Sequence, residues 1–85
     1  MKQLVEQKEG YPVIMKISPK LAAKVMKKDG QFIRIGLQRG LLPFGKAMKG
    51  KKQFNYYISP KQFMDYTGAS EEEIRSIAKK FDLAI

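Results

Sequence analysis

The stretch that decides the fold runs from Gly30 to Gly45 and reads GQFIRIGLQRGLLPFG. Its apolar residues recur at helical spacing, which predicts a short helix from about Gln31 to Arg39, stopped by Gly40 and Pro43. The side of this helix that faces the core would carry Ile33, Leu37 and Leu41. The opposite side would expose Gln31, Arg34 and Gln38. A glycine inside a helix costs about 1 kcal/mol relative to alanine, so Gly36 indicates a packing requirement.

Another helix is predicted immediately before this one. Ser18 can cap the free backbone N–H groups of a helix start, and Pro19 fits the first helical position. The helix then runs to about Lys28, and the turn at Asp29-Gly30, where glycine can take the positive φ that ends a helix, folds the next helix back across it. Its buried stripe would carry Leu21, Ala22, Val25 and Met26, and its opposite side carries Lys20, Lys24, Lys27 and Lys28. Four like charges repel one another unless an anion neutralises them; an ordinary solvated face is the alternative.

After Pro43 the pattern changes from helical spacing to alternation. Phe44 to Met48 and Gln53 to Ile58 predict two strands, joined by the turn Lys49-Gly50-Lys51-Lys52. The core side of the second strand would carry Phe54, Tyr56 and Ile58, with Gln53, Asn55 and Tyr57 outward. Positive charge continues along this hairpin at Lys46, Lys49, Lys51 and Lys52. The alternative to a basic wing is a solvated turn that has collected lysine.

Two more helices are predicted towards the C-terminus. Ser59-Pro60 starts a short helix that ends near Tyr66. Ser70 and Glu73 form a capping-box pattern ahead of a last helix from Glu71 to about Phe81. The apolar side of that helix would carry Ile74, Ile77, Ala78 and Phe81. Near the N-terminus, the alternation of Val13, Met15 and Ile17 predicts a short strand within residues 11–17.

These elements define one α+β domain, because 85 residues with 44% hydrophobic content can bury one small core. Residues 1–10 are expected to form an N-terminal arm and residues 11–69 the domain. Residues 70–85 form a C-terminal helix that packs on the domain or serves self-association. The chain has no cysteine, which excludes disulfides and a thiolate zinc site. No apolar run suits a membrane span or signal peptide, so we expect a soluble, cytoplasmic protein.

Positive charge is concentrated in the middle of the chain. Residues 1–9 sum to zero and residues 71–85 sum to −1, from three bases and four acids. Residues 10–70 carry 12 bases against Asp29 and Asp65, a sum of +10, and the whole chain carries +9. A basic surface favours a polyanion through counterion release, and nucleic acid is the commonest such partner. Lysine present for solubility alone is the alternative.

The outward side chains of the helix near residues 31–39 suit the reading of duplex DNA. Arginine can make two hydrogen bonds to the major-groove edge of guanine, and glutamine can do the same with adenine. Base contacts are therefore predicted for Gln31, Arg34 and Gln38. Phosphate contacts are predicted for Lys20, Lys24, Lys27, Lys28 and Arg39. Wing contacts are predicted for Lys46, Lys49, Lys51, Lys52, Asn55 and Tyr57.

Catalysis is not expected from this sequence. The chain has no histidine or cysteine, and its middle has two acids far apart in sequence, so the usual general bases and nucleophiles are missing. No glycine loop with the lysine and hydroxyl residue of a phosphate-binding loop is present. We therefore predict neither an enzyme nor a bound metal or cofactor.

The order of the elements resembles the winged helix-turn-helix of the MerR-like and excisionase families over about residues 17 to 68. The resemblance is carried by two helices around a tight turn, the phrase Arg39-Gly40-Leu41-Leu42-Pro43, the hairpin, and Ile58-Ser59-Pro60 leading into Phe63 and Tyr66. It is greatest for small DNA-binding proteins of bacteriophages and integrative elements. It implies that Arg34 contacts DNA and that residues 46–52 contact the DNA backbone. The long coiled coil and effector domain of full MerR regulators are missing, so no small-molecule effector is expected.

The resemblance implies an excisionase-like architectural factor or a transcriptional regulator. Its partners would be double-stranded DNA and a recombinase or polymerase, with a homodimer or cooperative array on DNA. Two other classes of function stay open. One is a protein-binding adaptor or inhibitor of phage origin that uses the last helix as its interface. The other is an RNA-binding protein, in which the outward Tyr57 stacks on a base.

Overall fold

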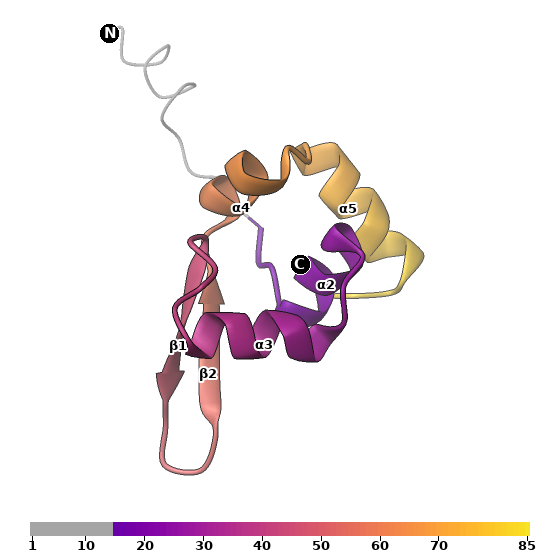
Figure 1. Ribbon diagram of the computed structural model, residues 1–85. Helices are drawn as coiled ribbons and strands as arrows, with labels where there is room; N and C mark the ends of the chain where they lie inside the picture. Colours follow the sequence, from indigo (N-terminus) through magenta and orange to yellow (C-terminus); the bar gives the residue numbers. More distant parts are fainter. Residues whose placement is uncertain (1–14) are drawn as a thin grey trace, which may run out of the picture.

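The computed structural model describes residues 15–85. These residues form four helices and one two-stranded antiparallel sheet, which confirms the predicted α+β class. In chain order the elements are α2 (Pro19–Met26), α3 (Gly30–Gln38), β1 (Gly45–Lys49), β2 (Phe54–Ile58), α4 (Pro60–Thr67) and α5 (Glu71–Lys80) (Figure 1). All four predicted helices and both hairpin strands are present, with ends that differ from the prediction by one or two residues.

The expected N-terminal arm, residues 1–10, lies outside the described residues, as do residues 11–14 of the expected N-terminal strand. The described part of that strand, residues 15–17, is not in a strand. The sheet within residues 15–85 consists of β1 and β2, and residues 15–17 do not join it. Met15 and Ile17 are nevertheless buried in the core.

Side chains cap the starts of the described helices. Ser18 Oγ accepts a hydrogen bond from the Leu21 N–H at 3.1 Å, and Ser59 caps α4 in the same way. At α5 the predicted capping box is present: Ser70 Oγ accepts from the Glu73 N–H, and the Glu73 carboxylate accepts from the Ser70 N–H. These bonds satisfy backbone donors that have no partner within a helix. The helix starts are therefore determined locally by the sequence.

The turn between α2 and α3 differs from the prediction. Lys27, with φ of 59°, takes the left-handed conformation that ends α2, and the Lys28 N–H donates to the Ala23 carbonyl at 2.9 Å. Gly30, which was expected to provide that conformation, is the first residue of α3. The Asp29 carboxylate caps α3 by accepting a hydrogen bond from its first turn. The left-handed conformation is strained for a lysine, and hydrogen bonds to the last carbonyls of α2 offset that strain at Lys27.

One hydrophobic core joins the four described helices. Its largest fully buried side chains are Leu21 of α2, Ile33 of α3, Phe44 before β1, Phe63 of α4 and Ile74 of α5. The rings of Phe44 and Phe63 meet edge to face with their centroids 5.0 Å apart, a favourable arrangement for aromatic side chains. Within residues 15–85 no polar or charged residue is buried. No helix in that part of the chain is both long and apolar enough to cross a membrane.

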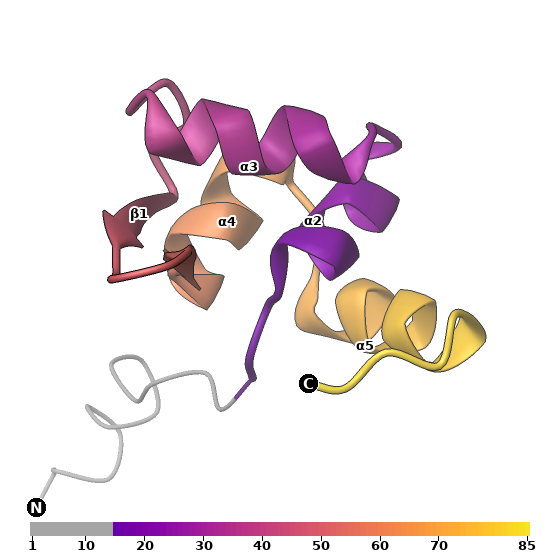
Figure 2. The same ribbon diagram turned by 90° about the horizontal axis from the view of Figure 1, so that it is seen from below.

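The helices and the hairpin occupy distinct sides of the molecule. In Figure 2, α3 lies along one outer edge and α5 lies along the opposite edge, with α2 and α4 between them. The hairpin lies beside the C-terminal end of α3, and its turn projects away from the helices (Figure 1). As predicted, Ile58 of β2 is buried and Tyr56 is half-buried, whereas Asn55 and Tyr57 are exposed. The base of the hairpin is closed by a hydrogen bond of 2.8 Å from the Ser59 N–H to the carbonyl of residue 44.

The prediction that Leu41 completes the inner face of α3 is wrong. Leu41 is 68% exposed, whereas Leu42 is 7% exposed and belongs to the core. The reason is Gly40, whose φ of 69° ends the helical path before Leu41. Leu42 then packs on α3: its Cδ1 lies 2.7 Å from the position that a Cβ would take at Gly36. This contact is the packing reason for a glycine inside the helix.

The packed side of α5 also ends earlier than predicted. Ile74 and Ala78 are buried and Ile77 is half-buried, but Phe81 is 42% exposed. Phe81 follows the last helical residue, so helical spacing no longer directs its side chain. The buried residues of α5 belong to the same core as those of α2.

Leu42 and Leu41 form a matched pair for testing this packing. Leu42→Ala removes a buried side chain, which should lower the free energy of unfolding by about 2 to 5 kcal/mol. Leu41→Ala alters an exposed side chain and should change that free energy by less than about 0.5 kcal/mol. Urea denaturation followed by circular dichroism measures both. Equal losses in the two variants would contradict the placement of Leu42.

Gly36→Ala tests the same contact from the side of the helix. Alanine normally stabilises a helix by about 1 kcal/mol relative to glycine. We expect the opposite sign here, because the new Cβ would lie 2.7 Å from Leu42 Cδ1. In a Leu42→Ala background the clash is removed, and Gly36→Ala should then stabilise the protein in urea denaturation. The same sign in both backgrounds would rule out the contact as the reason for glycine.

Candidate nucleic-acid interface

The three side chains predicted to contact bases lie on the exposed side of α3. Gln31, Arg34 and Gln38 are all exposed, while Ile33 and Leu37 on the opposite side are buried. Positions 31, 34 and 38 are separated by three and four residues, so they follow one side of the helix. Because α3 lies at the outer edge of the molecule (Figure 2), this side is accessible to a large partner.

A groove of about 450 Å³ lies between α2 and the start of α3. Its lining, which we call the cationic groove, consists of Lys20, Ala23, Lys24, Lys28, Asp29, Gly30 and Arg34. Four of these residues are cations and one is an acid, and the Asp29 carboxylate is already hydrogen-bonded to the Gln31 N–H at 3.2 Å. The groove is therefore positively charged, and it has room for a phosphate group.

Arg34 connects the cationic groove to the exposed side of α3. Its Nη1 lies 3.3 Å from the position that a Cβ would take at Gly30. The guanidinium therefore folds back over the first turn of α3, towards the lysines of α2. A larger residue at position 30 would press on this guanidinium, so glycine leaves room for it.

Three of the four lysines predicted to contact phosphate line the groove, and Lys27 does not. The predicted helix continued to Lys28, whereas α2 ends at Met26 and Lys27 takes a left-handed conformation. Helical spacing therefore does not place Lys27 beside Lys24. Lys27 is exposed, but the structure does not bring it together with the others.

The cations of the groove are not neutralised by acids of the described chain. No salt bridge within residues 15–85 involves them. Aromatic rings contact two of the lysines: Lys24 Nζ lies 4.5 Å from the centroid of the Phe81 ring, and Lys28 Nζ lies 5.4 Å from that of Phe32. A cation–π contact attracts an ammonium group without cancelling its charge. The groove therefore keeps its attraction for an anion.

The outward face of the hairpin carries three of the predicted wing residues. Lys46 lies directly across from Tyr57, and Met48 lies across from Asn55. Opposite residues of an antiparallel pair project to the same side, and all four are exposed. Lys49 is one position further along β1, so it projects to the other side.

The turn of the hairpin is shifted by one residue from the prediction. Lys49 is the last residue of β1, and the turn consists of residues 50 to 53. The Gly50 N–H donates to the Gln53 carbonyl at 2.8 Å, which closes the turn. Lys51 and Lys52 are exposed in this turn, which projects away from the helices (Figure 1).

Gln38 makes a contact that the sequence did not indicate. Its Nε2 donates a hydrogen bond of 2.6 Å to the Tyr56 hydroxyl. Tyr56 faces inward from β2, and the end of its half-buried ring reaches the end of α3. The two residues are 18 positions apart, so no spacing within one helix or strand could have paired them.

Arg39 follows Gln38 directly and caps the C-terminal end of α3. Its N–H donates to the Ile35 carbonyl at 3.0 Å, and its side chain is exposed. Because Arg39 lies beyond the last helical residue, its side chain is not aligned with those of Gln31 and Arg34. It is placed where the chain passes from α3 towards the hairpin.

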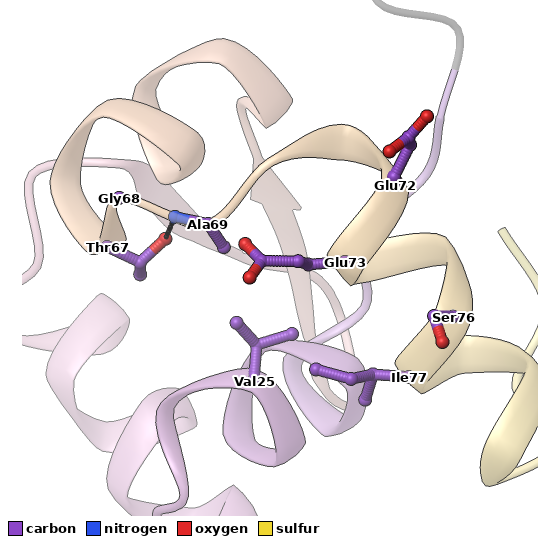
Figure 3. Close-up of a pocket in the computed structure, with 8 residues that line it drawn as sticks. All are labelled: Val25, Thr67, Gly68, Ala69, Glu72, Glu73, Ser76 and Ile77. Atoms are coloured by element: carbon purple, nitrogen blue, oxygen red, sulfur yellow. Dashed lines mark hydrogen bonds between the residues drawn. The ribbon is translucent and has the colours of Figure 1, made fainter.

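A second hollow, of about 570 Å³, lies between α2, α5 and the segment that joins α4 to α5 (Figure 3). It is lined by Val25, Thr67, Gly68, Ala69, Glu72, Glu73, Ser76 and Ile77. Glu73 belongs to the capping box, and Thr67 Oγ1 accepts a hydrogen bond from the Ala69 N–H at 3.2 Å. Its lining contains two acids and no cation, so it does not suit a phosphate group.

Comparison of the chain with protein-family models, with curated proteins and with solved structures gave no match. The candidate interface is therefore defined by geometry and charge. It consists of the exposed side of α3, the cationic groove at the N-terminal end of α3, and the basic hairpin beside its C-terminal end.

The cationic groove predicts stabilisation by a small multivalent anion. Pyrophosphate should raise Tm more than chloride does at the same low ionic strength, because it binds lysines that otherwise repel one another. Lys20→Gln removes one lining charge and should reduce this shift. Lys61→Gln makes the same charge change on α4, outside the groove lining, and should leave most of the shift. Both shifts are measured by thermal melting. If Lys20→Gln and Lys61→Gln reduced the rise in Tm equally, the stabilisation would depend on net charge alone.

Proposed function

We propose that the protein binds double-stranded DNA with sequence preference through a winged helix-turn-helix. α2 and α3 form the helix-turn-helix, α3 enters the major groove, and the hairpin is the wing. One observation carries the proposal: the exposed side of α3 lies between the cationic groove and the lysine-bearing hairpin. A helix in the major groove has a phosphate backbone on each side, so basic surfaces at both ends of α3 support this docking.

The dimensions of α3 support entry into the major groove. An α-helix with its side chains is about 10 to 12 Å across, and the major groove is about 12 Å wide. From Gln31 to Gln38 the helix rises about 10 Å, which corresponds to about three base pairs at 3.4 Å each. The candidate side chains can therefore contact neighbouring bases without distortion of the helix.

Each group of residues has a distinct role in this proposal. Arg34 contacts a guanine, and Gln31 and Gln38 contact adenines, because these side chains match the donors and acceptors of those bases. Phosphates on one side are contacted by Lys20, Lys24 and Lys28. Phosphates on the other side are contacted by Lys46, Lys51 and Lys52, with Arg39 between the two groups.

The biological role that we propose is an excisionase-like architectural factor or a transcriptional regulator of a mobile element. It is supported by the resemblance of Arg39-Gly40-Leu41-Leu42-Pro43 and the following hairpin to those families. Two residues of this phrase are also required by the structure: Gly40 adopts a positive φ, and Leu42 packs on α3. The phrase therefore supports the proposed winged helix-turn-helix more directly than it supports the biological role.

Selection of bound sequences from a random duplex pool at physiological salt tests the proposal. We expect an enriched motif. On that motif Arg34→Ala should lower binding by about 1 to 3 kcal/mol and relax the preference at one position. Lys51→Ala should weaken binding to all sequences alike and reduce the slope of affinity against salt by about one charge. Equal losses for both variants on every sequence would contradict base contact by Arg34.

Two other results would favour the alternative functions. Stronger binding of single-stranded RNA than of duplex DNA in competition would favour an RNA-binding protein, to which Tyr57, 59% exposed, offers a stacking surface. Binding of a protein partner that persists in salt strong enough to abolish DNA binding would favour an adaptor or inhibitor.

A further inference from the structure

Gln38 differs from the other two candidate base-contacting side chains in having a fixed partner. Its Nε2 donates to the Tyr56 hydroxyl at 2.6 Å. Within residues 15–85 no side-chain hydrogen bond is formed by Gln31 or Arg34. A free glutamine side chain samples several rotamers and its terminal amide turns easily, so the bond to Tyr56 restricts where this amide points.

Tyr56 is held in place by the hairpin. It lies across from Ala47 of β1, and its ring is half-buried against the core. The ring is also near that of Phe54, with the centroids 6.2 Å apart. The hydroxyl is thus fixed relative to α3, because backbone pairing and ring packing both restrict the side chain that carries it.

The hydrogen bond leaves the groups that read adenine free. Adenine offers the acceptor N7 and the donor N6 in the major groove, and a glutamine contacts them with one amide N–H and with Oε1. The amide nitrogen carries two hydrogens, so one N–H can bond to Tyr56 while the other bonds to N7. In the orientation that the structure shows, Gln38 donates to Tyr56, so Oε1 and the second N–H keep the arrangement that matches adenine.

We propose that Tyr56 is a positioning residue that orients the Gln38 carboxamide to read an adenine. The inference rests on the proposed entry of α3 into the major groove. It also couples the hairpin to base reading, because the same hairpin that contacts phosphates holds a base-reading side chain of α3. Tyr56 itself touches neither base nor phosphate in this arrangement.

Tyr56→Phe is the direct test, since it removes the hydroxyl and keeps the ring. The preferred motif is first determined with the unmodified chain, and duplexes that vary one base pair at a time are then titrated. We expect the preference for adenine at one position to fall about fivefold, the effect of one hydrogen bond. Binding to unrelated duplexes and the salt dependence should not change, because the phosphate contacts are intact.

Two further variants define the position concerned. Gln38→Ala should abolish the preference at the same base pair, and adding Tyr56→Phe to it should cause no further loss. Tyr66→Phe is the matched control: Tyr66 lies on α4 and is 53% exposed, so removal of its hydroxyl should leave every preference unchanged.

Gln38→Glu gives a test that does not depend on losing affinity. The introduced carboxylate can accept a hydrogen bond from the Tyr56 hydroxyl, and it offers acceptors where the amide offered a donor. Carboxylates read the N4 amino group of cytosine. We therefore expect the preferred base at this position to change from adenine to cytosine, and the change to be weaker when Tyr56→Phe is also present.

The outcomes separate this inference from the proposed function. A motif that Arg34→Ala alters but Tyr56→Phe leaves intact would overturn the role of Tyr56 and keep DNA binding. A uniform loss on all duplexes with Tyr56→Phe, together with a lower Tm, would show that the hydrogen bond only fastens the hairpin to α3. Absence of duplex binding by the unmodified chain would overturn both.

Discussion

The packing of Leu42 against α3 determines the path of the chain from α3 to the hairpin. The candidate interface depends on this path. Gly36 leaves the space that Leu42 fills, and Gly40 turns the backbone so that the chain returns over the helix. Phe44 then enters the core, and β1 begins at once beside the end of α3. The hairpin therefore has a defined position relative to α3, and this position allows Tyr56 to reach Gln38.

Local signals predicted the elements because each helix start carries its own cap. Ser18 and Ser59, each followed by proline, and the capping box of Ser70 act within three residues of themselves. The exposed side of α3 was predictable for the same reason, since a continuous helix fixes which positions share a face. The signals fail where the helix ends: Leu41, Lys27 and Phe81 were all placed by extending a helical spacing past the last helical residue.

Contacts between distant segments could not be predicted from spacing at all. The bond between Gln38 and Tyr56 joins α3 to β2, and a loop, β1 and the hairpin turn lie between them in the chain. The cationic groove likewise depends on how α2 crosses α3, which brings Arg34 towards lysines of the preceding helix. The sequence identified the charged residues, but it did not show where the fold brings them together. The repulsion among these cations is a cost to the folded state, and the apolar core has to offset it until an anion binds.

The lysines of the hairpin have a consequence for the protein when no ligand is bound. Within residues 15–85 the sheet has two strands, so β1 and β2 each leave one row of backbone groups unpaired. Such edges can pair with a strand of another molecule, and charged side chains on an edge strand discourage this. Lys46 and Lys49 lie on β1, so they oppose the joining of hairpins from separate copies. Neutralising them would remove this protection and favour aggregation through the hairpin edges.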